Sequence, residues 1–109
     1  MPAGRWIEVA SLDDLPPGSS REFSDGGRAY ALFRAGDDVT CLDGLCPHRG
    51  GRLADGPFDG SKVTCPRRGC LRWSFDVLTG ACPVGESLRR RLYPVRLAGR
   101  AILVDLSGG

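Results

Sequence analysis

Two cysteine-containing boxes constrain this chain more than any other feature of its sequence. The first box reads Cys46-Pro47-His48-Arg49-Gly50-Gly51, and the second reads Cys65-Pro66-Arg67-Arg68-Gly69-Cys70. A Cys-x-His pair on a tight loop can direct a thiolate and an imidazole toward neighbouring metal ions. The glycines allow the backbone to fold closely around such a centre. The boxes therefore predict a metal centre held between two loops.

The segment from Asp43 to about Val84 differs in character from the rest of the chain. It contains most of the cysteines, the single histidine, and many of the glycines and prolines. Loops of this kind bury little apolar side-chain volume, and a metal centre can supply the stability that a core does not. We therefore expect a metal-binding subdomain over about residues 43–84.

The cysteine count bears on how these thiols are used. The chain has five cysteines, an odd number that does not suit a complete disulfide framework. In a reducing compartment such cysteines are metal ligands or buried apolar residues, so we expect a cytoplasmic protein. We expect Cys41 and Cys82, which lie outside the boxes, to be buried apolar residues.

Several classes of function are disfavoured by the sequence. It contains no run of eighteen apolar residues, so we expect no membrane span. The first five residues lack the apolar core of a signal peptide. A net charge of +2 is too small to argue for nucleic-acid binding. No nucleophile–base arrangement and no nucleotide-binding glycine loop is evident, so we expect a protein that is not itself a catalyst.

Outside the boxes, short β-favouring stretches alternate with turns and show no helical periodicity. We expect Asp13–Gly18 to form a turn, and a second turn at Gly36–Asp38 to join two strands of a hairpin. The stretches predicted to be strands are Arg5–Val9, Ala29–Arg34, Val39–Leu42, Leu92–Leu97 and Ile102–Leu106, the last two forming a closing hairpin. These features predict one all-β domain over residues 1–109.

The boxes closely resemble those of the Rieske family, in which Cys-x-His is followed, after a spacer of about this length, by Cys-x-x-His. The stretches Leu53–Gly56 and Phe75–Gly80 also look like parts of Rieske ferredoxins. The similarity covers nearly the whole chain, from Trp6 to the closing hairpin. It implies the Rieske fold, in which small antiparallel sheets carry a cluster-binding loop subdomain at one tip, here about residues 43–84.

The resemblance also implies a cofactor and a function. In the family both cysteines bind the inner iron of a [2Fe–2S] cluster and both histidines bind the outer iron; Cys46, Cys65 and His48 match three of these four metal ligands. The resemblance to Rieske ferredoxins implies a protein that passes single electrons. The expected partners are a flavoprotein reductase and a terminal oxygenase or reductase component.

The fourth ligand position does not match the family, because it is occupied by Arg68. Arginine stays protonated below pH ~12 and has no lone pair to offer a metal. Since His48 is the only histidine, one copy of the chain cannot build a Cys₂His₂ site. The segment from Cys70 to Phe75 is also longer than the corresponding segment of most family members. This difference bears on the geometry of the loop that carries the second box.

Several interpretations of this substitution are open. In the first, Cys70 supplies the fourth ligand of a [2Fe–2S] cluster, since Cys-x₄-Cys spacing occurs in plant-type ferredoxins. In the second, the outer iron binds water, Arg68 or a group from a partner, and Cys70 only hydrogen-bonds a cluster sulfur. In the third, the fold has no functional cluster and acts as an interaction subunit, as in the nitrite reductase small subunit. A zinc site from Cys46, His48, Cys65 and Cys70 is a further alternative.

Arginines are frequent around the expected cluster tip. The two boxes and their flanks contribute Arg49, Arg52, Arg67, Arg68 and Arg72. Such a group can arise by chance in an arginine-rich protein, or it can form a basic docking rim for an acidic partner.

Overall fold

Three small antiparallel sheets make up the computed structural model, which describes residues 6–46, 51–66, 73–82 and 89–106. No α-helix occurs within these ranges, and the only helical segments there are two short 3₁₀ turns, η1 (Leu12–Asp14) and η2 (Leu53–Asp55). The terminal sheet has the order β1-β9-β8, the central sheet β2-β3-β4-β7, and the small sheet β5-β6. The expectation of an all-β fold of small antiparallel sheets is confirmed.

In the terminal sheet, the first strand of the described chain pairs with the last one. Its strands are β1 (Trp6–Ser11), β8 (Val95–Ala98) and β9 (Ala101–Asp105), with β9 between the other two. The hairpin of β8 and β9 is the predicted closing hairpin, although β8 does not extend back to Leu92 as expected.

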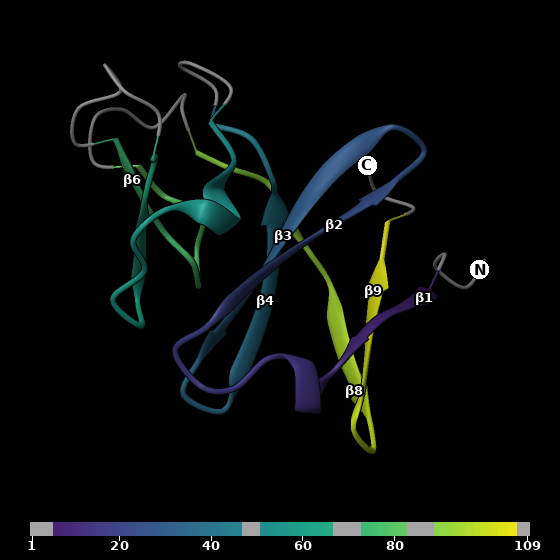
Figure 1. The fold of residues 1–109 in the computed structure, drawn as a ribbon. Coiled ribbons are helices and arrows are strands. Elements are labelled where there is room, and N and C mark those ends of the chain that lie inside the picture. The colour runs from purple at the N-terminus through teal and green to yellow at the C-terminus, as the bar shows by residue number, and fades with distance from the viewer. Residues whose placement is uncertain (1–5, 47–50, 67–72, 83–88, 107–109) are drawn as a thin grey trace.

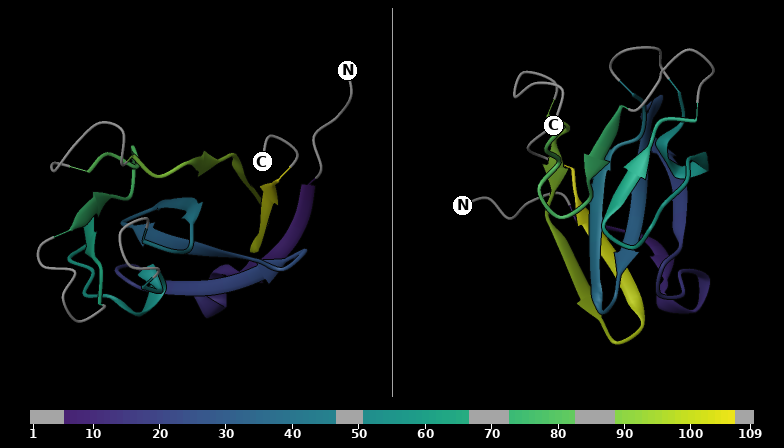
Figure 2. Two further views of the ribbon diagram at one scale, coloured as in Figure 1. Left: turned by 90° about the horizontal axis from the view of Figure 1, so that it is seen from above. Right: turned by 90° about the vertical axis from the view of Figure 1, so that its left-hand side faces the viewer.

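The central sheet lies between the other two (Figures 1 and 2). Its strands are β2 (Ser20–Asp25), β3 (Arg28–Ala35), β4 (Asp38–Asp43) and β7 (Leu92–Tyr93). Strand β3 is buried on both faces, as its large residues predict. Ala31 and Phe33 pack toward the small sheet, whereas Tyr30 and Leu32 pack toward the terminal sheet. The central sheet therefore separates two hydrophobic cores.

Pro94 divides a stretch that the sequence suggested was one strand. Residues 92–93 pair with β4 in the central sheet, whereas residues 95–98 pair with β9 in the terminal sheet. Proline has no N–H to donate to a ladder, so a strand cannot continue through it with full pairing. Its carbonyl oxygen accepts a hydrogen bond from Asp105 N at 3.0 Å. The predicted strand Leu92–Leu97 is thus two strands in different sheets.

The small sheet carries the second box. Its strands are β5 (Lys62–Thr64) and β6 (Ser74–Asp76), paired so that Val63 faces Phe75. Both of these side chains are fully buried in the core shared with the central sheet. The described chain on either side of both boxes reaches the same end of the molecule, at the upper left of Figure 1. Within the described ranges there is no helix long and apolar enough to cross a membrane.

Candidate metal centre

Of the residues that the sequence assigns to the site, two fall within the described part of the chain. These are Cys46, at the start of the first box, and Cys65, at the start of the second. His48, Arg68 and Cys70 lie outside the described residues. The described part of the centre therefore consists of the bases of its two loops.

The first loop is closed by the backbone of its own ends. Cys46 N donates a hydrogen bond to the carbonyl oxygen of Gly51 at 2.8 Å, and Leu45 pairs with Arg52 in an isolated antiparallel bridge. Cys46 therefore lies where the two ends of a short loop are hydrogen-bonded to each other, a position that we call the neck of the loop. The 3₁₀ turn η2 follows the loop directly and buries Leu53.

The second loop is closed in the same way. Cys65 N donates to the carbonyl oxygen of Trp73 at 2.9 Å, directly above the pairing of Thr64 with Ser74. The second box is thus the connection of the β5–β6 hairpin, and Cys65 is at its neck. Two loops that each begin with a cysteine at a hydrogen-bonded neck can bring two thiolates to one metal ion.

Cys46 and Cys65 are both buried and belong to the same hydrophobic core. Their exposed fractions are 2% for Cys46 and 5% for Cys65, and both belong to the hydrophobic core that contains Val63 and Phe75. Neither thiol is in a disulfide bond. Trp73 packs against this core as well. Buried thiolates beside short-loop amides suit an iron–sulfur centre.

The other two described cysteines lie outside the boxes. Cys41 lies in the core on the opposite face of the central sheet, and burial, followed by the nearby Asp43 carboxylate, raises the pKa of its thiol to about 12, which disfavours the thiolate that a metal binds. Cys82 shares the core of Cys46 and Cys65. Within the described ranges no three ligand side chains are grouped so that they could hold a metal ion, and this applies to all four of these cysteines. The expectation that Cys41 and Cys82 are buried is confirmed.

Arg52 is the one member of the predicted basic rim that lies in the described part of the chain. Its guanidinium pairs with Glu22 at 2.8 Å and with Asp55 at 3.6 Å, and the hydrogen bond to Glu22 raises its pKa further. A charge neutralised by two carboxylates adds little to a positive surface. At this position the ion pairs do not favour a basic docking rim over the chance alternative.

A polar network that the sequence analysis missed supports the first loop. Asp43, at the end of β4, accepts a hydrogen bond from Tyr93 Oη at 2.7 Å and one from Arg28 Nη2 at 3.2 Å. Burial, together with this bond to Asp43, raises the pKa of Tyr93 to about 12. Arg90 Nη1 lies 3.8 Å from the Asp43 carboxylate and donates to the carbonyl oxygen of Leu45 at 3.3 Å. The residue preceding Cys46 is therefore tied to the C-terminal part of the chain.

Gly80 joins the second hairpin to the same C-terminal segment. Its φ is +79°, its N–H donates to Asp76 O at 2.6 Å, and its carbonyl accepts from Arg90 N at 2.8 Å. A Cβ at this position would overlap the carbonyl oxygen of Arg90. Only glycine combines the left-handed conformation with this close approach.

We expect Gly80→Ala to lower the free energy of unfolding by about 2 kcal/mol or more, because the backbone must shift as well as adopt a strained conformation. Gly99→Ala is the matched control: Gly99 has a φ of +62° but open space around it. That change should cost only the left-handed backbone strain, about 1 kcal/mol. Urea unfolding of both variants gives the comparison, and equal losses would contradict the steric argument.

The comparisons with known proteins agree with this geometry. The family model described as "Rieske [2Fe-2S] domain" matches residues 5–97. The ferredoxin component of the naphthalene 1,2-dioxygenase system of Pseudomonas aeruginosa is 30% identical over 106 residues, covering 94% of this chain and 97% of that protein.

Solved structures show the same similarity. The ferredoxin of carbazole 1,9a-dioxygenase from Nocardioides aromaticivorans IC177 has a TM-score of 0.80 and 35% identity, over 92% of this chain and 96% of that one. A protein named as an NADH-dependent nitrite reductase small subunit, from Mycobacterium tuberculosis, has a TM-score of 0.78 and 25% identity, over 94% of this chain and 96% of that one.

Proposed function

The chain belongs to the Rieske [2Fe–2S] domain family, and on that premise we propose that it is a ferredoxin component that carries single electrons from a flavoprotein reductase to a terminal oxygenase. The observation that carries this proposal is the pair of buried cysteines, Cys46 and Cys65, each at the hydrogen-bonded neck of its own loop. The match to oxygenase ferredoxins over almost their full length supports it. In this role the chain is an electron carrier and not itself an enzyme.

The thiolate half of the expected ligand set fits a [2Fe–2S] cluster. We propose that Cys46 and Cys65 hold the inner iron, and that His48, as the nitrogen donor of the first box, holds the outer iron. When bound, the cluster supplies a one-electron redox couple. The chain's own part is to keep both thiols buried and out of disulfide bonds, and to hold the first loop through the hydrogen bond from Arg90 to Leu45.

The nitrogen half of the ligand set is one residue short. The chain has a single histidine, and the guanidinium of Arg68 has no free lone pair. We propose that Arg68 stands beside the outer iron without replacing the missing imidazole. We further propose that Cys70 donates a weak hydrogen bond to the cluster and is not a ligand. The fourth position is then filled by an exchangeable ligand such as water, or by a group from a partner.

A second function is favoured by that same missing ligand. A Rieske fold without a complete ligand set can act as an interaction subunit that carries no functional cluster. The structural similarity to the protein named as a nitrite reductase small subunit gives this alternative support. The two functions differ in whether the purified chain holds iron and takes up an electron.

The deciding experiment is the iron and acid-labile sulfide content of the chain purified without oxygen, together with a visible spectrum and a reductive titration. The carrier proposal expects about two irons and two sulfides per chain and reduction by one electron. Protein with its native fold but without iron or sulfide would refute the carrier and support the interaction subunit. Zinc in place of iron would refute both. We also propose a cytoplasmic location, where a reducing environment would keep the cysteines as thiols.

A further inference from the structure

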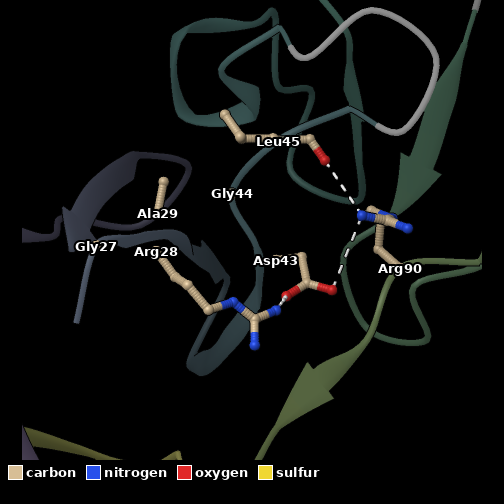
Figure 3. Close-up of a pocket in the computed structure, with 7 residues that line it drawn as sticks. All are labelled: Gly27, Arg28, Ala29, Asp43, Gly44, Leu45 and Arg90. Carbon is tan, nitrogen blue, oxygen red and sulfur yellow. Dashed lines mark hydrogen bonds and ion pairs between the residues drawn. The ribbon is translucent and has the colours of Figure 1, made fainter. Parts of the chain in front are cut away.

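A pocket of about 270 Å³ lies directly beside the first loop. It is lined by Gly27, Arg28 and Ala29 at the β2–β3 turn, by Asp43, Gly44 and Leu45 after β4, and by Arg90. Figure 3 shows Asp43 between the two arginines, with the Leu45 carbonyl pointing to Arg90. Since Leu45 precedes Cys46, the pocket adjoins the loop that carries the first cysteine.

The charged groups of the pocket leave it positive. Arg28 and Arg90 each contribute one positive charge and Asp43 contributes one negative charge, so a single positive charge is not balanced within the pocket. The Asp43 carboxylate is already engaged by Tyr93 and Arg28, at 2.7 and 3.2 Å, which limits its repulsion of a second anion.

One hydrogen-bond donor of a residue that lines this pocket has no acceptor within the described ranges. Arg90 Nε is buried and has no partner there, although Nη1 of the same guanidinium donates to Leu45 O. A buried N–H without an acceptor costs free energy that a ligand oxygen would recover. Arg28 is different, since its side chain is 54% exposed and can reach outward to a ligand.

We propose that this pocket receives an aspartate or glutamate side chain of the protein that exchanges electrons with the chain. Two guanidinium groups, which lie on either side of Asp43 in the pocket lining, can each donate to an oxygen of a further carboxylate. A carboxylate would balance the single excess charge, whereas the doubly charged phosphate of a nucleotide would exceed it. Docking here would set the partner against Leu45, whose side chain is 43% exposed, beside the first loop.

The proposal rests on the proposed electron-carrier function and deepens it by locating one contact of the partner. It also differs from the basic rim suggested by the sequence. Arg52 is neutralised by Glu22 and Asp55, whereas the pair Arg28 and Arg90 shares only one carboxylate. Within the described residues, the excess positive charge near the first loop is therefore at the Asp43 pocket.

The experiment titrates the full chain, labelled with ¹⁵N, with a hexaglutamate peptide at physiological ionic strength. We expect the Nε–H signals of Arg28 and Arg90 to shift on binding. We expect Arg28→Gln and Arg90→Gln each to raise the dissociation constant by about tenfold or more, because each removes a charge-assisted contact. Arg90→Gln also removes the contact to Leu45, so thermal unfolding is measured for each variant. If Arg90→Gln fails to fold, the test rests on Arg28→Gln, because the Arg28 side chain is exposed.

Arg100→Gln is the matched control for charge. Arg100 is exposed and pairs with Asp13 at 2.6 Å, at the β8–β9 turn, and its removal changes the net charge by the same amount. We expect less than about a twofold change in this variant, since salt screens charges beyond about 8 Å. Equal weakening in all three variants, equal binding of hexaglutamine, or no binding of hexaglutamate would overturn the proposal.

Iron, sulfide and reductive titration on the same samples separate this proposal from the function it rests on. A chain that holds a cluster and accepts an electron but binds no hexaglutamate would refute the pocket and leave the carrier intact. A chain that binds hexaglutamate at Arg28 and Arg90 but holds no cluster would refute the carrier, and with it a redox partner as the occupant.

Discussion

Replacing either Cys46 or Cys65 with serine is expected to abolish the visible colour of the protein and reduce its bound iron to background. In the proposed centre each thiolate would neutralise part of the charge of the inner iron, and a serine hydroxyl is a much poorer ligand for iron. Because both side chains are at least 95% buried, no water-exposed group can readily take their place. The measurement is the visible spectrum and the iron and sulfide content of anaerobically purified variants.

Cys41→Ser and Cys82→Ser are the controls, and both should keep the colour. Cys41 is on the far face of the central sheet and its thiol has a pKa raised to about 12, so it does not serve as a thiolate. Cys82 is the more demanding control, because it shares the core of the two proposed ligands. Colour that survives in Cys46→Ser or Cys65→Ser would refute the ligand assignment. If Cys82→Ser loses the colour while its fold is intact, Cys82 is also a ligand, which the assignment does not include.

The parts of the fold that the sequence predicted correctly are those with strong local signals. The turn at Gly36–Asp38 and the β-favouring residues on either side of it produce the hairpin of β3 and β4, which pairs Leu32 with Cys41. The turn around Gly99, with its φ of +62°, similarly defines the closing hairpin. Both elements are formed by residues that are neighbours in sequence, so local patterns contain the necessary information.

Two other elements could not be read in this way. Strand β2 was not predicted, because its sequence Ser-Arg-Glu-Phe-Ser-Asp has one large apolar side chain, and it becomes a strand by pairing along β3. The predicted strand Leu92–Leu97 was too long, because the pattern alternates through Pro94 while the pairing partner changes there. In both cases the tertiary partner, and not the local sequence, decides the structure.

The candidate site shows the same division. The boxes identify Cys46 and Cys65 because their residue types and spacing are local. The Asp43 network joins residues that are far apart in the chain, with separations of 50 for the bond from Tyr93 and 45 for the bond from Arg90 to Leu45. No local pattern predicts these contacts, and the same holds for the two carboxylates that neutralise Arg52.

Arg68→His is expected to produce the second large change, because it restores the nitrogen donor that the family pattern requires. With two thiolates and two imidazoles available from one chain, the cluster no longer depends on an exchangeable ligand or on a partner. We expect an increase in bound iron and sulfide toward two of each per chain, and a Rieske-type visible and electron paramagnetic resonance spectrum. The reduction potential should fall between roughly −150 and +300 mV, the range that histidine ligation gives.

Arg67→His is the matched control, since it introduces the same residue and removes the same charge one position earlier. The family pattern places the ligand at position 68, so histidine at position 67 should leave iron content and spectrum as they are in the parent chain. If both variants gain iron equally, loss of an arginine and not ligation is the cause. If Arg68→His changes neither iron content nor spectrum, the longer path from Cys70 to Phe75 prevents the second loop from presenting a ligand, and position 68 does not control the site. A gain in Arg68→His alone would show that the rest of the centre, from the necks at Cys46 and Cys65 to the hydrogen bond at Leu45, is already formed for a Rieske cluster.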